Sequence, residues 1–342
     1  MSRLVALLLA VLALGCLGPR YSFEDLPDVP IAFVYRNMTE AEQAADAFYK
    51  MEEKLRVART GIRARKRANT LSVDDMAQAF GVYGSGETRA ASSLGHLALL
   101  DPRTGVVETA DWAARGARPL AWSSDHQRLL YLSLRRGMPH IYERDFRTGD
   151  ITPITHTRRR HLDACYCGED AIVFAAFLPS GGSRLYHRRA GGGKAVPITD
   201  GPVDFAPSCA PDGSAVYWGS LEGRNAGTIY RRDLTDPDSQ AKVLTRGRHP
   251  SATPDGQWLV YSAKTRSGWK LWRMRTDGTG RHPLGRGASW EHQPTASTEG
   301  GYAVFVTTPA DKEVHFSIWV RPFDGDDDRP MAIDGEGLFP VW

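Results

Sequence analysis

Short segments with the same order of apolar and polar residues recur along the chain. Each has an aliphatic residue beside an apolar or aromatic one, followed by polar residues and a turn. The aliphatic positions are Leu97, Ile141, Leu185, Ile229, Leu271 and Ile318. They lie roughly 44 residues apart, which is the period of a four-stranded β-propeller blade. The pattern therefore predicts six blades.

A second landmark lies upstream of these segments. Residues 207–213 match residues 250–256 almost position for position, and residues 121–125 and 294–300 are weaker copies. Proline, aspartate and glycine at these positions predict a tight turn. A strand with high β propensity follows each turn, and many of these strands are apolar on both faces. Such strands are expected where a sheet packs between two neighbours.

The two ends of the chain predict how the ring closes. Residues 337–342 open another repeat that has no continuation, whereas the first repeat, around residues 80–109, lacks a clear opening strand. We expect the C-terminal strand to complete the first blade, which would remove exposed sheet edges. The predicted fold class is all-β, a six-bladed β-propeller over residues 76–342, preceded by a short helical N-terminal arm.

Residues 17–75 do not follow the repeat. Residues 39–42 (Thr-Glu-Ala-Glu) indicate a capping box, and the apolar spacing after them predicts a helix from about Thr39 to Arg67. The apolar stripe of this helix packs either on the propeller or on a partner. The basic residues between 63 and 67 are either a solvated face or a contact to anionic lipid head groups.

The first residues predict export. Arg3 precedes an apolar run over residues 4–14, which is too short to span a bilayer but matches a signal-peptide core. Cys16 follows Ala13, Leu14 and Gly15, and this ending resembles the bacterial lipobox. The resemblance implies a signal peptide over residues 1–15, lipidation of Cys16, and a tether and helical arm over 16–75. An ordinary cleaved signal and a retained anchor are the alternatives.

Three further cysteines are present, Cys165, Cys167 and Cys209. Export to an oxidising compartment permits one disulfide. The repeat register places Cys167 and Cys209 on the innermost strands of consecutive blades, so this pair is the predicted disulfide. Buried, unreactive thiols are the alternative, and Cys165 is left as the odd thiol.

The combined repeat resembles the TolB-like, or WD40-like, β-propeller family. The resemblance rests on the Pro-Asp-Gly turn, the aromatic strand, the Ile-Tyr pair (residues 141–142 and 229–230) and the closing Leu-Thr or Ile-Thr (residues 154–155, 198–199 and 244–245). It extends from about residue 76 to the C-terminus. It implies a propeller that docks an envelope protein from the periplasm or cell surface. By resemblance to enterobacterial lipoproteins, Leu17 after the cysteine favours the outer membrane. TolB itself carries a substantial α/β domain before its propeller, whereas this chain has only the short arm.

The segments before the inner strands should meet at one mouth of the central channel, where propellers usually bind their ligands. The candidate partner-binding residues are Arg118, His161, Asp163, Asp204, Arg248, His249, Glu291, His292, Gln293 and Glu336. Loops that are polar only because they are solvated are one alternative. A metal held by His161, His249 and His292 is another, by analogy with oligogalacturonate lyases.

The sequence contains no Gly-x-Ser-x-Gly nucleophile elbow, which argues against a propeller peptidase. With 43 basic and 40 acidic residues, the net charge of +3 gives no reason to expect nucleic acid as a partner. We expect a monomeric, non-catalytic binding scaffold without cofactor, held at the membrane by its N-terminal lipid. The alternative is a polysaccharide-binding or metal-dependent polysaccharide-degrading propeller.

Overall fold

The computed structural model describes residues 22–47, 50, 53, 95–169, 171–179, 181–189, 193–221, 227–285, 289–308, 316–323, 329–331 and 333–342. The predicted signal peptide, Cys16 and most of the predicted arm, including the basic residues 63–67, lie outside this range. Among the described residues, no helix is long and apolar enough to cross a membrane.

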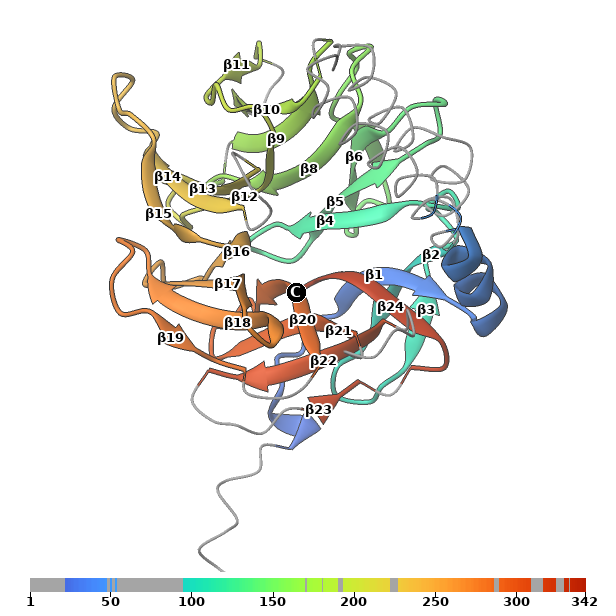
Figure 1. Ribbon diagram of the computed structural model, residues 1–342. Helices are drawn as coiled ribbons and strands as arrows, with labels where there is room; N and C mark the ends of the chain where they lie inside the picture. Colours follow the sequence, from blue (N-terminus) through green and yellow to red (C-terminus); the bar gives the residue numbers. More distant parts are fainter. Residues whose placement is uncertain are drawn as a thin grey trace, which may run out of the picture.

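Six four-stranded antiparallel sheets surround a central axis, as the sequence predicts (Figure 1). Blade 1 contains, from the axis outward, β24 (Glu336–Val341), β1 (Ile31–Arg36), β2 (His96–Leu100) and β3 (Val107–Thr109). Blade 2 contains β4 (Arg118–Trp122), β5 (Arg128–Ser133), β6 (His140–Asp145) and β7 (Ile151–Pro153). Blade 3 contains β8 (His161–Tyr166), β9 (Ala171–Phe177), β10 (Ser183–Arg189) and β11 (Val196–Pro197).

The remaining three blades run in the same order. Blade 4 contains β12 (Asp204–Cys209), β13 (Ala215–Ser220), β14 (Thr228–Asp233) and β15 (Lys242–Arg246). Blade 5 contains β16 (Arg248–Ala252), β17 (Trp258–Thr265), β18 (Gly268–Arg275) and β19 (His282–Pro283). Blade 6 contains β20 (Trp290–Ala296), β21 (Tyr302–Thr308), β22 (Ser317–Pro322) and β23 (Arg329–Pro330).

Blade 1 combines both ends of the described chain. The C-terminal strand β24 is its innermost strand, and this prediction is confirmed. The second strand, β1, comes from the segment assigned to the arm, so the predicted propeller boundary at residue 76 is wrong. The repeat pattern missed β1 because a long segment separates it from β2, the strand with which it pairs. The buried Trp342 indole adds a further contact, since its Nε1 donates to the Val29 carbonyl at 2.9 Å.

The hydrophobic core is divided among the blade interfaces. Between blades 6 and 1, for example, Ile318 and Val320 pack against Ile31 and Phe33, all fully buried. Similar clusters lie between the other neighbouring blades. The second strand of each blade thus buries both of its faces, which explains the continuous apolar runs in the sequence.

A helix over residues 38–47 follows β1. Its cap is Asn37, whose Oδ1 accepts from the Glu40 N–H at 2.9 Å, while Glu40 Oε2 accepts from the Asn37 N–H. The capping box therefore begins two residues before the predicted Thr39. Of the predicted helix to Arg67, only residues up to 47, with 50 and 53, are described. Glu40, Ala41 and Ala44 are buried, so this first part of the helix packs on the propeller.

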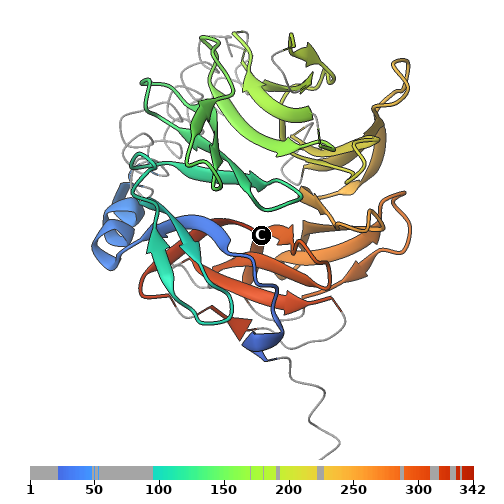
Figure 2. The ribbon, with the colours of Figure 1, turned by 180° about the vertical axis from the view of Figure 1, so that it is seen from behind.

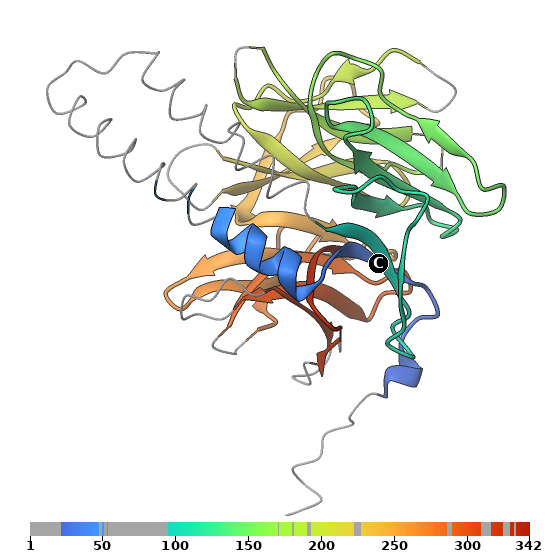
Figure 3. The ribbon, with the colours of Figure 1, turned by 90° about the vertical axis from the view of Figure 1, so that its right-hand side faces the viewer.

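The propeller has two distinct ends. We call the end where the six inner strands begin the mouth face, and the end carrying the turns that follow these strands the turn face. Because β1 is antiparallel to β24, the chain enters blade 1 at the turn face, next to the short helix η1 (Phe23–Asp25). Figure 3 shows η1 and the C-terminus toward the right and the helix over residues 38–47 further to the left.

Candidate functional site

The inner strands of all six blades line one central channel of about 640 Å³. Figure 2 shows the ring of blades from the side opposite to Figure 1, with the C-terminus near its centre. Much of the wall is apolar and rigid, because four blades contribute the prolines Pro207, Pro250, Pro294 and Pro340. A concave, largely apolar site with a few polar groups is the usual form of a ligand site.

Every inner strand carries a bulge at the same place, near its start. We call the residue at this place the apex residue. The six apex residues are Pro119, Asp163, Ala206, His249, Gln293 and Phe339. The last four have positive φ values between 47° and 52°, an uncommon conformation for residues with a side chain. Bulges change the direction of side chains, and all six apex residues line the channel.

Asp163 is the most strongly held apex residue. Its Oδ1 accepts from Arg118 Nη2 at 2.8 Å, and its Oδ2 accepts from the Ala206 backbone N–H at 3.0 Å. Burial alone raises the pKa of a carboxyl, but the Arg118 guanidinium and the Ala206 N–H outweigh burial here. They hold the pKa of Asp163 below its ordinary value. The carboxylate therefore stays ionised and joins blades 2, 3 and 4.

Further contacts continue this belt around the mouth. The Arg118 guanidinium lies 4.7 Å from the centre of the Phe339 ring, and the Phe339 N–H donates to Gln293 Oε1 at 3.2 Å. On the other side, the Phe205 and His249 rings are 5.5 Å apart. Apex residues and their neighbours thus connect successive blades. The mouth is a preorganised polar and aromatic rim above an apolar channel.

The ten predicted site residues all lie near the starts of the inner strands, but they do not form one ring. Four of them line the channel, namely Arg118, Asp163, His249 and Gln293. Arg248 and His292 turn to an aromatic group on blades 5 and 6 instead. The Arg248 guanidinium lies 4.8 Å from the Trp269 ring, and the His292 ring lies 6.1 Å from Trp269 and 6.3 Å from Trp290.

The other four predicted residues are buried between strands and have structural partners. Glu291 accepts from the Leu271 N–H at 2.7 Å and from Arg321 at 3.0 Å. Glu336 accepts from the Phe316 N–H at 3.2 Å, and Asp204 accepts from the Trp218 indole at 3.2 Å. These side chains are at most 3% exposed. Placing them in a partner-binding ring is therefore wrong, because their carboxylates hold neighbouring strands together.

His161 is the fourth buried residue, at 1% exposed. Its Nδ1 lies 3.2 Å from the Pro139 carbonyl oxygen and 3.5 Å from Thr155 Oγ1. His249 lines the channel and His292 faces the aromatic group, so the three histidines do not converge. In the described part of the chain, no group of three or more His, Cys, Asp or Glu side chains is arranged to hold a metal ion. The structure therefore does not bring the three histidines of the alternative metal centre together at one point.

The buried histidine predicts a pH-dependent stability. Burial lowers the pKa of His161 from 6.5 to about 4. The unfolded chain therefore binds more protons than the folded chain between these values, and stability is lost as the pH falls from 6.5 toward 4. We expect a loss of about 3 kcal/mol from this residue between pH 7 and pH 4. Urea unfolding at several pH values should show a flatter profile for His161→Gln, whereas the exposed His156→Gln should keep the wild-type profile.

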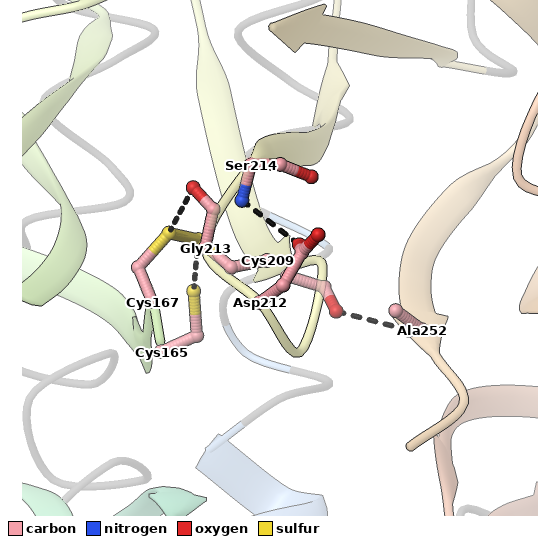
Figure 4. Close-up of a disulfide and its surroundings, with 8 residues drawn as sticks. Cys165, Cys167, Cys209, Asp212, Gly213, Ser214 and Ala252 are labelled. Atoms are coloured by element: carbon pink, nitrogen blue, oxygen red, sulfur yellow. Dashed lines mark hydrogen bonds between the residues drawn. A yellow bond between two sulfur atoms is a disulfide. The ribbon is translucent and has the colours of Figure 1, made fainter. Parts of the chain in front are cut away.

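The three cysteines lie together on the inner strands of blades 3 and 4. Cys167 and Cys209 form a disulfide with Cα atoms 5.1 Å apart (Figure 4). Cys165 is a buried free thiol whose Sγ lies 3.7 Å from Cys209 Sγ. Burial raises the pKa of Cys165 to about 12, so this thiol is protonated and unreactive in the folded protein. The disulfide ties two blades together close to the channel wall.

Sequence reasoning missed two aromatic residues of the mouth, Phe205 and Phe339. A signal was present, since four apex residues directly precede the repeated prolines, as in His249-Pro250 and Gln293-Pro294. Applying the same register to Phe339-Pro340 would have identified Phe339 as a channel residue. Phe205 lies one position earlier and gives no comparable signal.

The comparisons with known proteins agree with this geometry. Residues 116–342 match the family model described as the TolB beta propeller domain. A curated relative, an uncharacterized protein of Agrobacterium fabrum, is 25% identical over 190 residues, which cover 52% of this chain. The match spans 62% of that relative's length, less than two thirds of it.

Solved structures share the fold at low sequence identity. TolB from Acinetobacter baumannii has a TM-score of 0.63 at 18% identity, covering 92% of this chain and 67% of its own. The putative TolB from Agrobacterium tumefaciens has a TM-score of 0.57 at 20% identity, covering 64% and 81%. Hydrazine synthase from Kuenenia stuttgartiensis has a TM-score of 0.56 at 12% identity, covering 72% and 43%.

Likenesses at this identity show the fold alone, and the fold occurs both in TolB proteins and in an enzyme. They therefore leave open whether this chain is catalytic. The family assignment is firmer, because its model covers more than half of the chain, including five complete blades and the closing strand β24. The predicted resemblance is confirmed: the chain belongs to the TolB β-propeller domain family.

Proposed function

We propose that this protein is a non-catalytic binding scaffold of the bacterial cell envelope, which docks a partner protein at the mouth face of its propeller. The observation that carries the proposal is the belt of apex residues and their neighbours at the mouth. Arg118, Asp163, Gln293 and Phe339 form a preorganised rim of aromatic and charge-assisted contacts around an apolar channel. Arginine and aromatic residues in such rims commonly dominate the affinity of protein interfaces.

The envelope setting rests on the sequence, where Cys16 and the preceding apolar run resemble a lipoprotein signal. We propose anchoring of Cys16 in the outer membrane, with the propeller in the periplasm. The fold is compatible with this arrangement. The described chain begins at Ser22 beside η1, at the turn face, so a lipid on Cys16 would place the membrane on the side opposite the mouth. The mouth face would remain accessible to a partner.

Loss of the arginine at the rim is expected to weaken partner binding. Arg118→Ala removes the guanidinium that joins Asp163 to Phe339, and we expect a loss of about 2 kcal/mol, or roughly thirtyfold in affinity. Affinity capture from crosslinked envelopes, quantified by mass spectrometry, would measure the retained partner.

Arg128 is a matched control for Arg118. It is also half-buried, lies 5.3 Å from an aromatic ring (Tyr166) and pairs with a carboxylate (Glu143, 3.7 Å), but it is located at the turn face. Arg128→Ala should cost similar stability and leave capture unchanged. Equal capture by both variants would refute docking at the mouth.

A further inference from the structure

Two loops at the mouth face carry five arginines and no acidic residue. Residues 134–139 join β5 to β6, and residues 154–160 join β7 to β8. The arginines are Arg135, Arg136, Arg158, Arg159 and Arg160, all exposed. We call them the arginine patch. None of the five forms an ion pair with any residue that the structure describes, whereas Arg115 nearby is paired with Glu40.

The two loops lie against each other at the junction of blades 2 and 3. The His161 N–H donates to the Pro139 carbonyl at 3.0 Å, and the His140 and His161 rings are 5.5 Å apart. These contacts connect the base of one loop to the base of the other. The two loops that carry the arginine patch therefore meet at this junction of the mouth face.

Some of the arginines are held in place by their neighbours. Arg159 donates to the Tyr186 hydroxyl and lies 5.5 Å from the centre of that ring, and Arg160 lies 5.3 Å from the Phe177 ring. Arg135 donates to the Trp112 carbonyl. Stacked guanidinium groups keep free N–H donors and lose less entropy when they bind a ligand. Arg136 and Arg158 extend from the same two loops.

In the described part of the chain, the buried titratable side chains at the base of the two loops are histidines rather than carboxylates. His161 occupies the position on its inner strand that Asp204 and Glu291 occupy in blades 4 and 6. It is buried, as is His140, and His161 Nε2 and His140 Nδ1 have no hydrogen-bond partner among the residues that the structure describes. Burial lowers the pKa of both imidazoles, and Arg136 and Arg159 lower it further, so both rings stay neutral. The charge of the arginine patch is left for an external anion.

We propose that the arginine patch is the docking surface for an acidic polypeptide segment of the partner, a proposal that rests on the proposed protein-binding function and extends it. Guanidinium groups pair with carboxylates in bidentate geometry. A glycan fits less well, because Tyr186 and Phe177, which could stack on sugars, lie beneath arginines. A lipid surface fits less well, because the chain enters the propeller at the opposite face.

The test uses a fluorescein-labelled peptide containing a run of glutamates, with the glutamine version of the same peptide as the neutral control. Binding by anisotropy is compared for the wild-type chain, for Arg136→Glu with Arg158→Glu, and for Lys264→Glu with Arg266→Glu. The last pair changes the net charge equally, at exposed positions on the mouth face of blade 5.

We expect the patch variant to bind the acidic peptide about tenfold more weakly, and the blade 5 variant to bind it nearly as well as wild type. Wild-type binding should also weaken between about 50 mM and 200 mM salt, since the contacts are exposed. Equal weakening by both variants, or no preference for glutamate over glutamine, would overturn the proposal.

Two further probes test which class of ligand binds the arginine patch. Tighter binding to phosphatidylglycerol-containing vesicles or to heparin than to the acidic peptide would overturn the choice of a polypeptide. Because these variants leave the apex residues unchanged, a failure here with intact Arg118-dependent capture would refute the arginine patch alone. If Arg118→Ala captures the partner as well as wild type while the acidic peptide still binds, only the docking at the mouth is refuted.

Discussion

Glu291→Ala is expected to lower the free energy of unfolding by about 3–5 kcal/mol. Glu291 receives two guanidinium N–H groups of Arg321, at 3.0 and 3.3 Å, and the Leu271 backbone N–H at 2.7 Å. Arg321 is 1% exposed and stacks 4.8 Å from the Phe305 ring, so it cannot reach water when its partner is removed. The substitution removes the carboxylate that binds this buried guanidinium at the interface of blades 5 and 6.

Denaturant unfolding of the Glu291→Ala variant would measure this loss. The control is the double variant Glu291→Met with Arg321→Met, which removes both charges together and should recover most of the stability. A loss below about 1 kcal/mol for Glu291→Ala would contradict the structural role of this carboxylate. It would also return Glu291 to the candidate binding residues.

Loss of the disulfide is the second large effect. The bridge between Cys167 and Cys209 closes a loop with a sequence separation of 42 residues. Chain-entropy arguments for a loop of this length give a stabilisation of about 4 kcal/mol. We expect Cys209→Ser to lose this amount, as measured by thermal or urea unfolding without reductant.

The choice of Cys209 matters for this experiment. Cys165 lies 3.7 Å from Cys209 Sγ, so in Cys167→Ser it remains available as a substitute partner for Cys209. Cys209→Ser removes the sulfur that both possible bridges share. Reductant should destabilise the wild type and leave Cys209→Ser unchanged. If reductant has no effect on the wild type, the bridge contributes no stability.

The overall fold could be predicted because every blade repeats the same order of apolar strands and polar turns. Pivots such as Ile141 and Ile229 are fully buried and mark the third strand of a blade, and the Pro-Asp-Gly turns mark the end of the innermost strand. β1 could not be predicted in this way. Its only repeat partners, β2 and β24, are separated from it by long stretches of chain, so no local period marks it.

The place of the candidate site could be predicted from the sequence, but which side chains face the channel could not. All ten predicted residues lie at strand starts, yet a shift of one or two positions decides whether a side chain faces the channel or the neighbouring strand. Gln293 lines the channel, whereas Glu291 is buried against Arg321. This difference depends on the bulge and on the partner strand, which are long-range features of the ring.

The most direct test of partner docking at the mouth is site-specific photocrosslinking in the intact envelope. A photoreactive amino acid is placed at Arg246, exposed at the mouth face, or at Ser124, exposed at the turn face. We predict one dominant protein adduct from position 246, strongly reduced by Phe339→Ala, and no such adduct from position 124. An adduct that forms equally from position 124, or that persists unchanged in Phe339→Ala, would contradict a binding site at the mouth of the propeller.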